Sequence, residues 1–155
     1  MKPMQAHGIP VGFLLAQTAK TTARAFDDAL QERGGSLPVW LILKALMQGG
    51  HRTQAELAAM VGVQGPTLTH HLNGMERDGL LTRSPLPDNR RVHEVTLTEA
   101  GRALFLKLRQ AAMAFDARLR AGIDAADLDV FRAVLQRMSA NVGGAAEPAD
   151  DDATG

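Results

Sequence analysis

The chain has no cysteine and no tyrosine, and only 4% of its 155 residues are aromatic. The absence of cysteine excludes disulfides, thiolate metal sites and thiol-based redox sensing. A low aromatic content suits helices rich in Leu and Ala, and it argues against a β-sandwich, whose strands favour aromatic and β-branched residues. With 45% hydrophobic residues, the composition favours one mainly helical domain with an ample core.

Long apolar runs are also lacking, because no run approaches the roughly 20 residues that span a bilayer. The apolar patch in MKPMQAHGIPVGFLLAQTAK is too short and interrupted for a signal peptide. The chain carries 17 basic and 17 acidic residues and therefore has no net charge. Four of the acids crowd into the last segment, AAEPADDDATG, which leaves a weak basic bias elsewhere. We expect a soluble cytoplasmic protein with no membrane partner.

Apolar residues three and four apart predict long helices over residues 11–33, 99–120 and 126–142. A shorter helix follows Ser36, which can cap it, and this helix is apolar nearly all round. That pattern is typical of a buried central helix.

The middle of the chain predicts a winged helix-turn-helix. Thr53 and Glu56 form a capping box, Gly62 is a natural left-handed stop, and Gly65-Pro66 opens the next helix. The segment LLTRS, the turn PLPDNRR and the segment VHEVTLT then predict a β-hairpin, or wing. The fold class is therefore mainly α with a small β-hairpin wing.

We divide the chain into a helical dimerisation region (residues 9–35 and 99–143), a winged helix-turn-helix DNA-binding domain (36–98) and a disordered acidic tail (144–155). The alternative is that the terminal helices pack within one monomer. If they form a dimer interface, five apolar residues should be buried between protomers: Leu14, Leu15, Leu128, Phe131 and Leu135.

Two adjacent histidines, His70 and His71, lie in the second helix of the motif. Neighbours on a helix point about 100° apart, so the pair cannot share one task. With Leu68, Leu72 and Met75 on the buried face, His70 belongs to the outward face and His71 to the edge of the buried stripe. His71 is then either a buried histidine bonded to a backbone carbonyl or a polar group lining a pocket.

The segment LTRSPLPDNRRVHEVTLTEAGRAL resembles the multiple antibiotic resistance regulator (MarR) family, through its Asp-x-Arg-Arg turn and the following Leu-Thr-Glu-Ala-Gly. LPVWLILKAL and TQAELAAMVGVQGPTLTHHLNGMERDGLL are similar to the second helix and the helix-turn-helix of that family. The resemblance covers roughly residues 11–142. It implies a homodimeric winged-helix transcription factor, commonly a repressor released by a small aromatic or phenolic acid.

The wing makes physical sense as a DNA contact. Arg90 or Arg91 at a hairpin tip can reach into a narrow minor groove, where the phosphates focus negative potential. Asp88 should pair with a wing arginine and hold the turn in shape. The alternative is a solvated basic turn. By the resemblance, Arg90 is the minor-groove residue.

The outward face of the second motif helix should meet the major groove, where Gln can read adenine and Thr methyl groups can meet thymine. Arginine is common in the family at the position of His70, so phosphate binding should be weaker here. A dimer should bind a pseudo-palindrome in double-stranded DNA. The predicted DNA-contacting residues are Arg52, Thr53, Gln64, Gly65, Pro66, Thr67, Thr69, His70, Asn73, Arg83, Asp88, Arg90 and Arg91.

In the family, the effector pocket lies between the dimer helices and the winged unit. An aromatic face with a cation or histidine there suits a flat aromatic carboxylate of benzoate or hydroxypyridine-carboxylate type. Phe13 and Trp40, the only tryptophan, can instead be core residues. The predicted ligand-binding residues are Phe13, Gln17, Trp40, Lys44, His51 and His71.

The sequence also bears on three other functions. A zinc-responsive regulator of the same fold draws on His51, His70, His71 and His93, but these residues lack a compact ligand spacing. A non-DNA-binding interaction module is a second alternative. An enzyme is not expected, because the sequence has no Gly-rich phosphate loop, nucleophile elbow or paired-acid signature. We expect neither a metal nor a cofactor.

Overall fold

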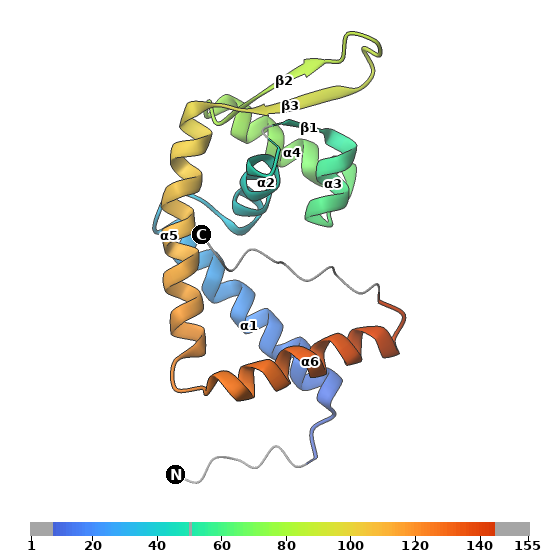
Figure 1. Ribbon diagram of the computed structural model, residues 1–155. Coiled ribbons are helices and arrows are strands. Elements are labelled where there is room, and N and C mark those ends of the chain that lie inside the picture. Colours follow the sequence, from blue (N-terminus) through green and yellow to red (C-terminus); the bar gives the residue numbers. More distant parts are fainter. Residues whose placement is uncertain (1–7, 50, 145–155) are drawn as a thin grey trace. The chain divides into compact units, whose positions relative to one another are not determined.

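The computed structural model describes residues 8–49 and 51–144, except for the side chain of His51. The predicted fold class is confirmed: helices dominate, and a small sheet carries the wing (Figure 1). The elements are α1 (Val11–Gln31), α2 (Leu37–Met47), β1 (His51–Thr53), α3 (Gln54–Val61), α4 (Gly65–Arg77), β2 (Leu81–Pro85), β3 (His93–Leu97), α5 (Glu99–Arg120) and α6 (Ala125–Asn141).

The chain divides into two compact units, Met1–Asp116 and Ala117–Gly155. The first holds α1 to β3 and most of α5, and the second holds the end of α5 and all of α6. The tail that the sequence predicts to be disordered lies outside the described residues, apart from Gly144. Among the described helices, none has the length and apolarity that a membrane crossing requires.

The junction of α1 and α2 is closed by polar caps. Gly34 has a φ of +88°, which favours glycine and ends the α1 turn. Ser36 caps α2 as predicted, because its Oγ accepts a hydrogen bond from the Val39 N–H at 3.3 Å. Asp27 of α1 accepts the Leu37 N–H at 2.7 Å, so a carboxylate satisfies another free donor at the start of α2.

The helix-turn-helix forms as predicted. Thr53 Oγ1 accepts the Glu56 N–H at 3.2 Å and donates to Glu56 Oε1 at 3.0 Å, which caps α3. Gly62 ends α3 with a φ of +75°. After the turn, α4 begins at Gly65 with Pro66 in its first turn, where the missing N–H of proline costs nothing.

The sheet is antiparallel and has three strands in the order β1-β3-β2, whereas the sequence predicted only the hairpin β2-β3. The additional strand pairs Arg52 with Val95 and Thr53 with Glu94. Its three residues, HRT, have no apolar alternation, so nothing in the local sequence predicts a strand. It forms because the edge of β3 offers unpaired backbone groups.

The wing turn is closed by backbone bonds and by Asn89, not by the predicted ion pair of Asp88. The Leu86 N–H donates to the Val92 carbonyl at 2.9 Å, and the Arg91 N–H donates to Asn89 Oδ1 at 3.2 Å. Among the described residues, no partner lies within ion-pair distance of Asp88, which is exposed. The reason is that an Asx turn at Asn89 fixes this loop locally.

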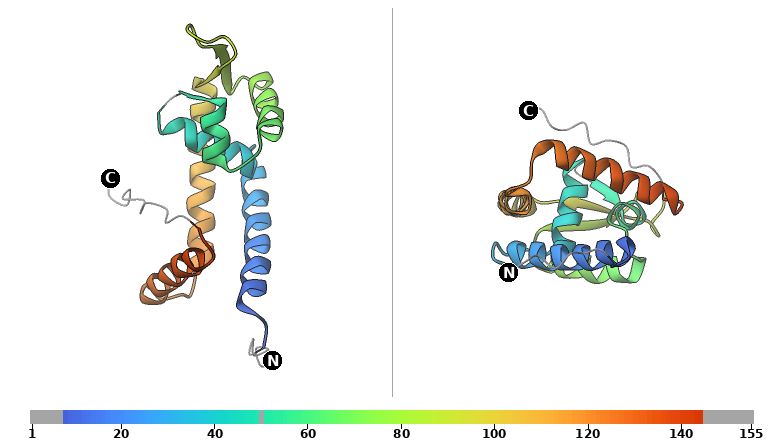
Figure 2. Two further views of the ribbon diagram at one scale, coloured as in Figure 1. Left: turned by 90° about the vertical axis from the view of Figure 1, so that its right-hand side faces the viewer. Right: turned by 90° about the horizontal axis from the view of Figure 1, so that it is seen from below.

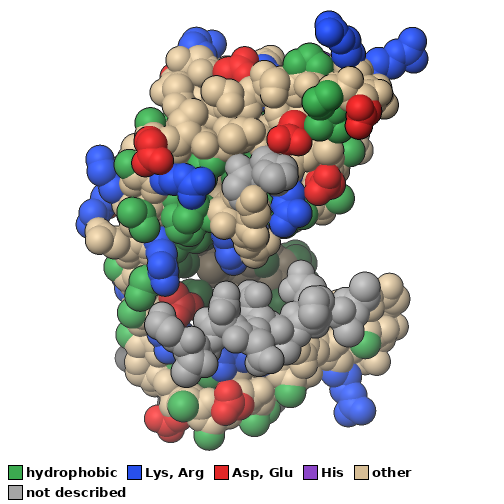
Figure 3. Space-filling view, turned by 45° about the horizontal axis from the view of Figure 1, so that its top comes forward, with side chains coloured by type: hydrophobic (Ala, Val, Ile, Leu, Met, Phe, Trp, Pro, Cys, Tyr) green, Lys and Arg blue, Asp and Glu red, His purple; other side chains and the backbone are tan. Residues whose placement is uncertain are grey.

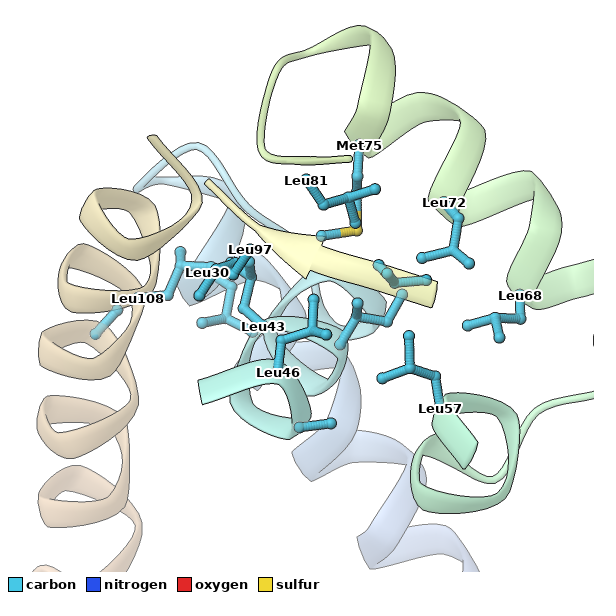
Figure 4. Packing of buried hydrophobic residues seen from close by; sticks show 14 residues of the cluster. Leu30, Leu43, Leu46, Leu57, Leu68, Leu72, Met75, Leu81, Leu97 and Leu108 are labelled. Carbon is cyan, nitrogen blue, oxygen red and sulfur yellow. The ribbon is translucent and has the colours of Figure 1, made fainter. Parts of the chain in front are cut away.

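The core lies where α2, α3, α4 and the sheet meet. Leu43 and Leu46 of α2 face Leu57 of α3 and Leu72 of α4 (Figure 4). Leu30 at the end of α1 and Leu108 of α5 complete the buried cluster. The N-terminal half of α1 extends away from this core (Figures 1 and 2).

The start of α5 is attached to the core by Thr98 and Gly101, both in the Leu-Thr-Glu-Ala-Gly motif. The Thr98 hydroxyl donates to the Gly79 carbonyl at 2.7 Å and accepts the Gly101 N–H at 3.1 Å. A β-carbon on Gly101 would clash with the Leu80 carbonyl oxygen and lie 2.6 Å from Leu97 Cδ1. This motif therefore sets the close approach of α5 to the β2 side of the core.

The second unit consists mainly of α6, and none of its described residues is buried. Phe131 and Val134 are 54% and 43% exposed. Leu128, Leu135 and Met138 are partly exposed. This helix therefore carries an apolar stripe that its own unit does not bury.

Candidate nucleic-acid interface

The recognition helix α4 has one buried face and one open face, as predicted. Leu68, Leu72 and Met75 are at most 2% exposed and point into the core (Figure 4). On the open face, His70 is exposed, whereas His71 is only partly buried. His71 is therefore not a fully buried core histidine, because its position at the edge of the stripe leaves it partly exposed.

The two histidine rings contact each other edge to face, with centroids 5.7 Å apart. Their planes are 61° apart, so the two rings meet although neighbours on a helix leave it in directions about 100° apart. Within the described residues, no three His, Asp or Glu side chains lie close enough together to hold a metal ion.

The N-terminal turn of α4 is open to solvent. Gln64, Gly65, Pro66 and Thr67 are all exposed, and Thr69 is partly exposed. Gln64 is the N-cap residue, but its side chain does not cap the helix, which leaves the amide available to other partners. A helix N-terminus with free N–H groups also favours an anion such as a phosphate.

The wing presents basic residues on a turn that is closed by hydrogen bonds. Arg90 and Arg91 are both exposed, and the Arg91 N–H is fixed by Asn89. Figure 3 shows Lys and Arg side chains projecting at the end where Figure 1 places the β2-β3 turn. Two guanidinium groups therefore extend from the fold beside the hairpin tip.

Arg83 of β2 connects the wing to α4. Its backbone N–H and its Nε donate to Glu76 Oε2 at 3.0 and 3.3 Å, and its Nη2 donates to Glu76 Oε1 at 3.3 Å. The same Nη2 donates to Asn73 Oδ1 at 2.6 Å. Hydrogen bonding from Arg83 holds the pKa of the Glu76 carboxyl below its ordinary value.

Two of the predicted contacts, Arg52 and Thr53, are engaged within the fold. Arg52 Nη1 lies 3.6 Å from Glu56 Oε2, and its Nε is buried without a hydrogen-bond partner in the described structure. The Thr53 hydroxyl caps α3. DNA contacts by these residues, and by Arg83, stay predictions.

The predicted effector residues do not form one cluster within a single chain. Trp40 stacks on Phe105 with ring centroids 5.3 Å apart, and it packs against the core. Phe13 is 58% exposed and lies about 25 Å along α1 from Leu30, at 1.5 Å per residue. Gln17 and Lys44 are exposed, and the side chain of His51 lies outside the described structure.

Glu76 and the connecting role of Arg83 were not predicted from the sequence, although the sequence carries a signal for them. Leu81 is buried and strand residues alternate, so Arg83 faces the same side as Leu81. An arginine on the inward side of a strand requires an acceptor, and the last turn of the preceding helix offers Glu76 as one.

The MarR family profile matches residues 36–93. The HTH-type transcriptional repressor Rv2887 of Mycobacterium tuberculosis is 28% identical over 136 residues, which are 88% of this chain and 98% of the relative.

Among solved structures, Bordetella bronchiseptica BpsR, whose DNA binding is regulated by 6-hydroxynicotinic acid, is similar to this chain with a TM-score of 0.75. It is 23% identical, over 83% of this chain and 98% of that one. A mutant of Escherichia coli MarR in complex with operator DNA has a TM-score of 0.76 and 20% identity, over 88% and 99% of the two chains. At these identities the solved structures share the fold. The family profile and the names of the relatives point to a transcriptional regulator rather than an enzyme, and the fold is that of the winged-helix MarR structures.

Proposed function

We propose that the protein is a cytoplasmic homodimeric repressor that binds a pseudo-palindromic operator and is released by a small aromatic acid. The observation that carries the DNA part is the connection of two exposed reading elements, α4 and the wing, by Arg83. An exposed helix face suits the major groove, and Arg90 suits the minor groove beside it. The relative that is named a repressor supports the sign of regulation.

The homodimer is supported by apolar side chains that one chain leaves in solvent. They lie on the N-terminal half of α1, where Leu14 and Leu15 are 41% and 39% exposed, and on α6. A 17-residue helix with no buried residue is marginal in water, so α6 needs a partner surface. We therefore keep residues 9–35 and 99–143 as the dimerisation region and 36–98 as the DNA-binding domain.

The DNA proposal is tested with duplexes from the region upstream of the protein's own gene. A dimer should protect two half-sites about 10 bp apart, which is one helical turn. Inserting about 5 bp between the half-sites rotates one half-site to the opposite face of the duplex, and this should abolish tight binding. Equal affinity for the two duplexes would exclude a rigid dimer, and no binding to any duplex would support the interaction-module alternative.

The effector proposal draws on the positions of the aromatic and cationic residues. Trp40, Lys44 and His71 lie in the DNA-binding domain, whereas Phe13 and Gln17 lie at the free end of α1. A common pocket for all five residues therefore requires α1 of a second protomer. BpsR, which responds to 6-hydroxynicotinic acid, supports a flat heteroaromatic carboxylate as the effector class.

The effector is sought by a thermal-shift screen of benzoates and hydroxypyridine-carboxylates, followed by a DNA-release assay. An acid weakens DNA binding only through its different affinity for the two conformations. Because the chain has one tryptophan, a bound acid at this site should change Trp40 fluorescence in parallel with release. If an acid releases DNA without this change, and with full potency against His71→Ala and Lys44→Ala, the pocket lies elsewhere.

A further inference from the structure

Asn73 lies on the open face of α4, three residues after His70, and its side chain is hydrogen-bonded to Arg83 of β2. It is exposed, and its Oδ1 accepts a hydrogen bond from Arg83 Nη2 at 2.6 Å. We propose that Arg83 and Glu76 are positioning residues that turn the Asn73 amide so that its N–H2 group donates a hydrogen bond to DNA. This rests on the proposed function, in which α4 contacts the major groove.

The polarity of the amide follows from chemistry. A guanidinium group has five N–H donors and no acceptor, so only the oxygen of an amide can face it. The amide nitrogen of Asn73 must therefore point away from Arg83. Because the oxygen already bonds to a cation at short range, the N–H2 group is the part of the side chain left to bind a partner.

The guanidinium group is itself held in place. Glu76 accepts hydrogen bonds from Nε, Nη2 and the backbone N–H of Arg83. The Arg83 side chain is only 17% exposed. Charge-assisted bonds to both carboxylate oxygens restrict the rotation of the guanidinium fork. The orientation of Asn73 is therefore fixed before DNA arrives, which lowers the entropy cost of binding.

A donor in this position matches an acceptor on DNA. Acceptors available to it are phosphate oxygens, and N7 and O6 of guanine, N7 of adenine and O4 of thymine in the major groove. The two-bond contact of asparagine with adenine also uses the amide oxygen as an acceptor. Competition with Arg83 for that oxygen disfavours this pairing here.

The donor role is tested with Asn73→Asp, which keeps an acceptor for Arg83 and replaces the N–H2 group by oxygen. We expect the affinity for an operator duplex to fall about tenfold or more, as for a lost hydrogen bond to a charged group, with an unchanged melting temperature. Wild-type affinity in a folded Asn73→Asp variant would overturn the proposal.

The positioning role is tested by a double-mutant cycle on DNA affinity. Asn73→Ala should cost much less in an Arg83→Lys background than in the wild type, because lysine cannot make the forked contact. Glu76→Gln serves as the second background if Arg83→Lys folds poorly. Additive losses would show that Arg83 and Asn73 act independently, and would overturn this role.

Two further arms separate the possible partners. If Asn73 donates to a phosphate, Asn73→Ala should weaken binding to all duplexes by the same factor. If it donates to a base, the variant should lose its preference at one base pair. A wild-type protein that binds no duplex overturns the proposed function as well. By contrast, if Arg90→Ala weakens binding and Asn73→Asp does not, only the present inference is overturned.

Discussion

Gly101 lies in the first turn of α5, where a β-carbon has no room. The nearest obstacle is the Leu80 carbonyl oxygen, a backbone atom that cannot move as a flexible side chain does. This contact gives a physical reason for the glycine in the Leu-Thr-Glu-Ala-Gly motif. The sequence allowed the motif to be identified by resemblance only, because the contact joins residues far apart along the chain.

We predict that Gly101→Ala lowers the free energy of unfolding by about 1–3 kcal/mol, the usual cost of overpacking. Gly74→Ala is the matched control in α4, where the added β-carbon meets only Arg77 Nη2 at 3.5 Å. That variant should gain about 0.5–1 kcal/mol, because alanine favours a helix interior. Urea denaturation measures both, and equal effects of the two variants would contradict the steric argument.

Glu76 gives a pH-dependent contribution to stability with a definite sign. Its pKa in the folded protein lies below the ordinary value of 4.5, first because of the hydrogen bond from Arg83. The folded state therefore binds a proton less readily than the unfolded state near that pH. The contribution is complete above the ordinary value and is lost as the pH falls through the lowered pKa.

We predict that Glu76→Gln is less stable than the wild type by about 0.5 kcal/mol at pH 7, a small value because solvent screens a carboxylate that is 41% exposed. The difference should shrink as the pH falls below about 4 and should also shrink in high salt. Urea denaturation between pH 3 and 7 measures it. A difference that grows on acidification would contradict the ion-pair assignment.

At the scale of elements, helices were predicted well because their ends carry local signals. Ser36, Thr53 and Gly62 mark helix ends in the structure as in the sequence. The short strand β1 was missed, because its formation depends on the distant edge of β3. The outward face of α4 was predicted from periodicity, but its link to the wing through Arg83 depends on tertiary contacts.

In the wing, the sequence predicts a DNA contact for Arg90 and closure of the turn for Asp88, and the two predictions can be tested separately. Arg90→Ala should weaken operator binding and reduce its salt dependence, since one phosphate-directed cation is lost. Asp88→Asn should leave the turn intact, because Asn89 and the backbone close it. Fluorescence anisotropy at several salt concentrations measures both, with the melting temperature as a control for folding. Full affinity of Arg90→Ala would remove the wing from the mechanism.

At the scale of the whole molecule, the proposed recognition of a pseudo-palindrome depends on a fixed distance between two α4 helices. One chain supplies one α4 and one wing, whereas a pseudo-palindrome needs a second copy at a set distance. In this proposal, the exposed apolar residues of α1 and of α6 are therefore as relevant to function as the residues proposed to contact DNA. Sequence periodicity identified these residues, but it cannot say which chain covers them.

We predict that Phe131→Asp converts a dimer into monomers at micromolar concentration. Because the dimer is twofold symmetric, the substitution removes two apolar contacts per dimer, worth about 3 kcal/mol or more together. The dissociation constant of the dimer should therefore rise by more than about 100-fold. Gln136→Asp is the matched control, since it adds the same charge at an exposed polar position of α6. Sedimentation equilibrium measures the oligomeric state.

The same variant links assembly to DNA binding. A monomer can occupy one half-site only, so Phe131→Asp should lose most affinity for the full operator and keep its weak affinity for a single half-site. Gln136→Asp should bind both duplexes as the wild type does. If Phe131→Asp stays dimeric, the interface does not run through this face of α6. If it is monomeric and still binds the full operator tightly, the spacing argument fails.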